Sequence, residues 1–175
     1  NLVDYLKFNT KILKTDFITY DNLQIADIMV VYVPLVNVNN FIFDRFGSFE
    51  YKHSATIVLN RVLTLEKNSK SPKMYLNIES SHFEIISIDN NHLKFYNRFY
   101  YQTKEDFIYY LLFTIEQLQL NPEEIPVVLM GSINKSDELY QIAYKYIRHV
   151  SLLPEESMRY SNDANTNHFT LLNSL

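Results

Sequence analysis

The chain contains no cysteine. This absence excludes disulfides, thiolate metal ligands and a thiol nucleophile, and it is typical of proteins that stay in the cytosol. The five histidines are never three to five residues apart, so the sequence has no helical pair of zinc ligands. The longest apolar stretches, residues 28–36 and 107–113, are far shorter than a membrane span. We expect no secretion signal and predict a cytoplasmic protein.

Glycine is nearly absent, because only Gly47 and Gly131 occur in the chain. Average usage of about 7% would give about a dozen. The Walker loop, the dinucleotide fingerprint and the kinase glycine loop each need several closely spaced glycines, since only glycine adopts positive φ without strain. All three are excluded. The chain is also rich in Asn, Ile, Lys, Tyr and Phe, and this bias lowers the glycine count in general.

Positive charge is neither abundant nor clustered. The formal net charge is −4, and the 16 lysines and arginines are scattered along the chain. Binding of nucleic acid or of an anionic membrane requires a concentrated positive surface. We therefore expect neither partner.

The first half of the chain predicts alternating strands and helices. Residues 28–33 form a continuous run of β-formers closed by a proline, which predicts a strand buried on both faces. Asn37 is placed to cap a helix that ends at Gly47, residues 49–53 alternate as a short strand, and a helix starts at Ser54. The polar residues 68–72 mark the expected domain boundary.

The second half predicts a three-strand meander followed by helix, strand and helix. Strand-like runs cover residues 74–78, 83–88 and 92–100, with an Asp-Asn-Asn turn before the last. Thr103 starts a helix with an apolar face, residues 127–130 form a buried strand, Ser136 caps a second helix, and residues 150–153 form a last strand. We predict for that second helix a buried stripe of Leu139, Ile142, Ala143, Tyr146 and Ile147. The fold class is α/β, with mixed sheets flanked by helices and a βββαβα core.

Six stretches of the chain carry a family resemblance: residues 4–9, 31–34, 105–113, 116–126, 129–131 and 168–172, of which 105–126 is the most specific. They resemble an uncharacterised family of the Bacteroidetes, domain-of-unknown-function family 3822, which has an actin-like ATPase (ribonuclease-H-like) fold. The resemblance implies that residues 1–70 are the remainder of a first actin-like domain whose opening strands are missing. Residues 71–175 are then the second actin-like domain. We expect exposed strand edges or apolar surface in the first part.

The resemblance also implies where a nucleotide would bind. Its second-domain phosphate loop falls on Glu79, Ser80 and Ser81, where the acidic and hydroxyl residue types are kept but the glycine is not. Its adenosine loop, with two adjacent glycines in the superfamily, falls on Gly131 and Ser132 and keeps one. We therefore predict a degenerate nucleotide site. We assign no catalytic residue, no metal site and no definite cofactor, and expect the chain neither to hydrolyse ATP nor to bind it tightly.

The sequence leaves three possible functions to compare. The first is a non-catalytic binding or scaffolding protein with protein partners. The alternative is an active actin-like ATPase or phosphotransferase, in which Glu79 positions a magnesium-bound water. A ribonuclease-H-like nuclease would need converging carboxylates, for which Glu79, Glu105, Asp106 and Glu116 are candidates, but the strand 127–130 ends without an acid.

Aromatic residues are dense around the third strand and the helix after it. Most are expected in the core, and a patch around the end of the third strand is expected to form an exposed partner surface, since patches of tyrosine are typical of interfaces. The residues concerned are Tyr96, Phe99, Tyr100, Tyr101, Tyr109, Tyr110 and Phe113.

Overall fold

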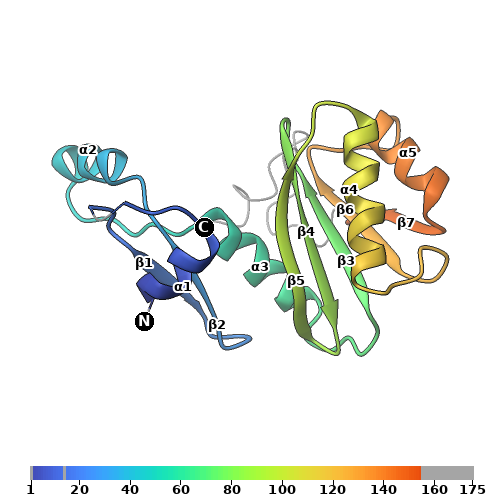
Figure 1. The fold of residues 1–175 in the computed structure, drawn as a ribbon, viewed down its shortest axis with the longest axis horizontal. Coiled ribbons are helices and arrows are strands. Elements are labelled where there is room, and N and C mark those ends of the chain that lie inside the picture. Colours follow the sequence, from blue (N-terminus) through green and yellow to red (C-terminus); the bar gives the residue numbers. More distant parts are fainter. Residues whose placement is uncertain (1, 14, 155–175) are drawn as a thin grey trace. The chain divides into compact units, whose positions relative to one another are not determined.

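The structure is a computed structural model that describes residues 2–13 and 15–154 (Figure 1). The chain divides into two compact units, residues 1–60 and 61–175. Each unit is described by itself. Helix α3 (Ser54–Leu65) begins in the first unit and ends in the second. None of the helices in the described residues is both long enough and apolar enough to cross a membrane.

The first unit is built around a two-stranded antiparallel sheet. It contains α1 (Leu2–Asn9), β1 (Thr19–Leu23), β2 (Ile28–Tyr32) and α2 (Val36–Phe46). The strands pair from Thr19 with Tyr32 to Leu23 with Ile28, and Asp27 takes a positive φ of 51° in the turn between them. A two-stranded sheet has no inner strand, so both strands remain at an edge.

Three predictions for this unit are wrong. Strand β2 is not buried on both faces, because Met29 is exposed and the rest of the strand is only half-buried. Helix α2 starts at Val36 and has no side-chain cap, so Asn37 lies inside it, and none of its side chains is buried. Residues 49–53 form no strand. Alternation alone did not produce a strand there, because a strand also needs a neighbour to pair with.

The second unit contains a five-stranded mixed sheet. Its elements are β3 (Lys73–Ile78), β4 (His82–Asp89), β5 (His92–Tyr100), α4 (Lys104–Gln117), β6 (Pro126–Gly131), α5 (Glu138–Tyr146) and β7 (His149–Leu152). The strand order is β5-β4-β3-β6-β7. The first three strands in sequence pair antiparallel, and β6 lies parallel to both β3 and β7. The predicted meander and the βββαβα order are confirmed.

The turn between β4 and β5 follows the expected chemistry. Asn90 and Asn91 have φ values of 49° and 61°. Two successive residues with positive φ match the right-handed twist of a hairpin, and asparagine tolerates this conformation better than most residues. The predicted asparagine turn is therefore confirmed.

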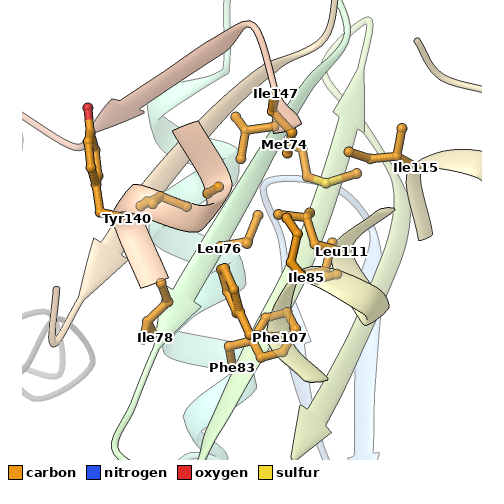
Figure 2. Close-up of a cluster of buried hydrophobic side chains, with 14 of the residues drawn as sticks. Met74, Leu76, Ile78, Phe83, Ile85, Phe107, Leu111, Ile115, Tyr140 and Ile147 are labelled. Atoms are coloured by element: carbon orange, nitrogen blue, oxygen red, sulfur yellow. The ribbon is translucent and has the colours of Figure 1, made fainter. Parts of the chain in front are cut away.

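Helices α4 and α5 lie on one face of this sheet and bury its main core (Figures 1 and 2). Phe107, Leu111 and Ile115 of α4 are completely or almost completely buried, as predicted from their spacing. Their partners are alternate strand residues, because successive side chains of a strand point to opposite faces. These partners are Met74, Leu76, Ile78, Phe83, Ile85, Val127 and Leu129.

Helix α5 differs from its prediction in its cap and in part of its stripe. The residue before the helix is Asp137, which makes no side-chain capping bond, whereas the Ser136 hydroxyl donates to Asn134 Oδ1. Tyr140 is buried, and Tyr146 is exposed instead. Ala143 and Ile147 of the predicted stripe are buried, and Leu139 and Ile142 are half-buried against the same core.

Candidate functional site

The five predicted nucleotide-site residues lie together at the carboxyl ends of two neighbouring parallel strands. Ile78, the last residue of β3, pairs with Gly131, the last residue of β6. The Ser132 N–H donates to the Ile78 carbonyl oxygen at 2.7 Å. From β3 the chain runs to one side of the sheet through β4 and β5, and then crosses over to β6 on the other side. The strand order reverses here, which is where open α/β sheets usually bind ligands.

The Glu79–His82 turn is short and closed. The Glu79 N–H donates to the His82 carbonyl oxygen at 2.9 Å, which leaves a loop of only Ser80 and Ser81. The Tyr101 hydroxyl donates to the Glu79 carbonyl oxygen at 2.7 Å. Both serines are exposed and neither has a positive φ. A phosphate cradle needs several N–H groups that converge on one point, and the Glu79 N–H is already bound within this turn.

Gly131 has a structural reason to be glycine. Its φ is +88°, and a Cβ built on it would lie 2.3 Å from the Ile78 carbonyl oxygen and 2.9 Å from Asn77 Oδ1. Such contacts are not possible without movement of the backbone. The glycine is therefore required by the close approach of β6 to β3, whether or not a nucleotide binds.

Three of the acidic residues considered for a nuclease, Glu105, Asp106 and Glu116, lie on α4 and do not converge on one point. Asp106 closes the N-terminus of α4: it accepts from the N–H groups of Gln102 and Thr103 at 3.0 Å each. Glu105 and Glu116 are exposed on α4. Within residues 2–13 and 15–154, no three or more acidic or histidine side chains are grouped in a way that could hold a metal ion. The converging carboxylates of two-metal chemistry are therefore not assembled in the described part of the chain.

A buried carboxylate on the opposite sheet face was not predicted. Glu84 of β4 is 1% exposed, and its Oε2 accepts from Asn77 Nδ2 at 2.9 Å. Its Oε1 accepts from the Tyr96 hydroxyl and from Arg98 Nη2, each at 2.7 Å. Burial by itself raises the pKa of Glu84, but these three bonds outweigh it and hold the pKa below its usual value of 4.5. The signal in the sequence was a lone charge in an apolar strand.

A second acid, Glu66, lies just after α3. Its Oε1 accepts from Lys73 Nζ at 2.7 Å and from the Tyr75 hydroxyl at 2.5 Å. Burial raises the pKa of Glu66, and the bonds from Lys73 and Tyr75 more than offset this and lower it. Each of the two acids links neighbouring elements of the second unit, and a structural role accounts for both.

In the first unit, Asp21 of β1 anchors the start of α3. Its Oδ2 accepts from the His53 N–H at 2.8 Å and from the Thr56 hydroxyl at 2.6 Å. Its Oδ1 accepts from the Tyr32 hydroxyl at 3.1 Å. A carboxylate at a helix N-terminus satisfies backbone donors that have no partner within the helix. The Asp21 carboxylate thus holds the His53 backbone at the start of α3.

Six of the seven aromatic residues separate into two groups, and the seventh, Tyr100 at the end of β5, is exposed. Tyr96 and Tyr101 bind Glu84 and Glu79 through their hydroxyls, as described above. A continuous series of rings instead runs outwards from β5 over α4, and we call its four residues the aromatic surface: Phe99, Tyr110, Tyr109 and Phe113. Successive ring centroids in this series are 5.0, 5.4 and 6.0 Å apart.

The outer end of the aromatic surface faces solvent. The side chains of Tyr109 and Phe113 are 61% and 44% exposed, and their rings are stacked with an interplanar angle of 18°. Phe99 and Tyr110 are half-buried beneath them. Exposed aromatic side chains that contact one another are enriched at the surfaces that bind protein partners.

Comparison with known proteins identifies a family and a fold. A search of curated proteins finds no match. A solved structure from Bacteroides thetaiotaomicron VPI-5482, described as a protein with actin-like ATPase fold and unknown function, aligns with a TM-score of 0.76 and 20% identity. The alignment covers 87% of this chain and 59% of that one, so the chain spans less than two-thirds of its relative. The chain thus has an actin-like fold. Residues 1–150 match the model of the family described as "Protein of unknown function (DUF3822)", and the chain belongs to that family.

Proposed function

We propose that the chain is a binding or scaffolding protein of actin-like fold, with protein partners and a degenerate nucleotide site. The observation that carries this proposal is the closed turn at residues 79–82. In this turn the Glu79 N–H donates to the His82 carbonyl oxygen and is not free to bind a phosphate. The loop also contains no glycine that would let the backbone approach a phosphate.

Two further observations support the proposal. The single glycine near the turn is explained by its contact with Ile78, so it is no evidence for an adenosine site. The aromatic surface provides an exposed patch of the kind that partners bind.

The alternative is an ATPase or phosphotransferase. It is favoured by the convergence of Glu79 and Ser132 at the point where the strand order reverses. There, Glu79 would position a magnesium-bound water.

Titration calorimetry and phosphate release distinguish the two functions. We expect the purified 175-residue chain to give no binding heat with magnesium-ATP at concentrations up to about 1 mM. A dissociation constant of about 1 mM corresponds to a binding free energy of only about 4 kcal/mol. We also expect no magnesium-dependent release of phosphate. Glu79→Ala is the control for a contaminating ATPase. Tight binding, or turnover that Glu79→Ala abolishes, would establish the alternative.

A further inference from the structure

The outer face of α4 combines aromatic rings with negative charge. Glu105, Tyr109 and Phe113 follow one another at intervals of four residues, and Glu116 lies three residues beyond Phe113. Residues three and four apart on a helix are neighbours on its surface. The stacked rings are therefore bracketed along the helix by a carboxylate at each end.

The basic side chains nearest to this face are Lys104 of α4 and those of β5. Lys104 Nζ lies 3.4 Å from a carboxylate oxygen of Glu138 on α5 and is drawn towards that helix. On β5, Arg98 alternates with Phe99, which packs on the core beneath α4, and its guanidinium binds Glu84 on the opposite face of the sheet. Lys94 lies at the bulge where the register between β4 and β5 shifts. Apart from Lys94 and the paired Lys104, the described residues of α4 and β5 place two acids and no base on the face that carries the aromatic surface.

We infer that this face binds a cationic segment of a partner protein, one that presents two arginines on either side of apolar side chains. The inference rests on the proposed binding function and names the chemistry of the partner. Glu105 and Glu116 are eleven positions apart, which on an α-helix is about three turns or roughly 16 Å. Arginine fits better than lysine, because its planar guanidinium both pairs with a carboxylate and stacks on an aromatic ring.

Other occupants fit the charges less well. If two α4 helices from two copies of the chain packed antiparallel, Glu105 of each copy would lie opposite Glu116 of the other. These like charges would repel one another. Phosphate backbones and anionic lipid surfaces are repelled for the same reason. Complementary charge at the rim with rings at the centre is the usual arrangement of a specific interface.

The probe is a fluorescently labelled helical peptide with two arginines eleven positions apart and leucines between them on the same face. Fluorescence anisotropy measures its binding to the full 175-residue chain. A matched peptide carries glutamates in place of the arginines. We expect the chain to bind the arginine peptide at least tenfold more tightly than the glutamate peptide.

Two variants of the chain test the site. The double variant Tyr109→Ser with Phe113→Ser should weaken binding of the arginine peptide at least tenfold. Glu105→Lys with Glu116→Lys should do the same, and should also reverse the preference so that the glutamate peptide binds more tightly. All four side chains are exposed, so the variants should keep the circular dichroism spectrum of the parent.

Matched controls separate a specific site from general attraction. Glu123→Lys with Glu124→Lys makes the same change in net charge on another exposed segment, and Tyr144→Ser removes an exposed ring from α5. Both should leave peptide affinity within twofold of the parent. The inference is overturned if the arginine peptide does not bind, or if the Glu123 and Glu124 variant weakens it as much as the Glu105 and Glu116 variant.

Sedimentation of the chain alone tests for a second copy as the occupant. If the chain is a dimer and the double variant Tyr109→Ser with Phe113→Ser is a monomer, the inference is overturned in favour of self-association. A monomeric parent chain supports the inference. Failure of the peptide experiment is distinguishable from failure of the proposed function, because the proposed function is tested by ATP binding and turnover, which the peptide experiment does not measure.

Discussion

Replacing Gly131 with alanine tests whether the close approach of β6 to β3 explains this glycine. The new Cβ would lie 2.3 Å from the Ile78 carbonyl oxygen, well inside van der Waals contact. The oxygen belongs to the backbone of an inner strand of the sheet and also accepts from the Ser132 N–H at 2.7 Å. It cannot move without disturbing that bond and the neighbouring pairs.

The expected loss of stability has two parts. A left-handed conformation costs a residue with a Cβ about 1–2 kcal/mol. Forcing an extra carbon into a packed site costs about 1–3 kcal/mol more. Gly131→Ala should therefore lower the free energy of unfolding by about 2–5 kcal/mol. At about 2–4 °C for each kcal/mol, the melting temperature should fall by roughly 4 °C or more.

Gly47→Ala is the matched control. Gly47 also has a positive φ, of +81°, but no atom lies within 4 Å of the Cβ position. It should lose only the conformational part of the free energy. Urea unfolding followed by circular dichroism measures both losses, and hydrogen exchange of residues 126–131 locates the effect of Gly131→Ala in β6. If Gly131→Ala costs less than 1 kcal/mol, the steric argument is refuted, and a ligand becomes the better reason for the glycine.

Two further predictions concern the second unit. The pKa of Glu84 is lower in the folded chain than its usual value of 4.5. The bonds of Glu84 to Arg98 and its other partners therefore stabilise the fold fully above pH 4.5, and this stabilisation is lost as the pH falls through the pKa of the folded state. Urea unfolding at several pH values between 7 and 3 should show this loss, and Glu84→Gln should be less stable at pH 7 and lose less on acidification; an unchanged pH profile would contradict the assignment. Leu111→Ala removes a fully buried side chain and should cost about 2–5 kcal/mol in thermal or urea unfolding, whereas Leu112→Ala, in a half-buried side chain of the same helix, should cost clearly less. Equal losses would show that α4 is rotated from its described position.

The order of elements in the second unit could be predicted from the sequence because each one has a strong local pattern. The spacing of Phe107, Leu111 and Ile115 matches one face of a helix, and that face is buried. Asn90 and Asn91 predicted a tight turn, since their side chains tolerate positive φ. These signals involve residues a few positions apart, so no distant partner is needed to interpret them.

Predictions failed where the outcome depended on a distant partner. The alternating residues 49–53 have no strand to pair with, and His53 is instead bound by Asp21 from another part of the chain. Likewise, Tyr140 and not Tyr146 is buried, because the core that Tyr140 joins is made of side chains from distant strands and from α4.

For the candidate site, the amino-acid sequence by itself determined the shortage of glycine, which excludes the glycine-rich phosphate loops. It also placed Glu79 and Gly131 at the ends of two strands. Only the tertiary structure decided that these strands are neighbours, that Gly131 is held against the Ile78 carbonyl, and that the rings of Tyr109 and Phe113 stack in solvent between two acids. The reason is physical: local patterns report contacts within a few residues, whereas register, crossover and the exposed face of a helix are set by packing between segments far apart in the chain.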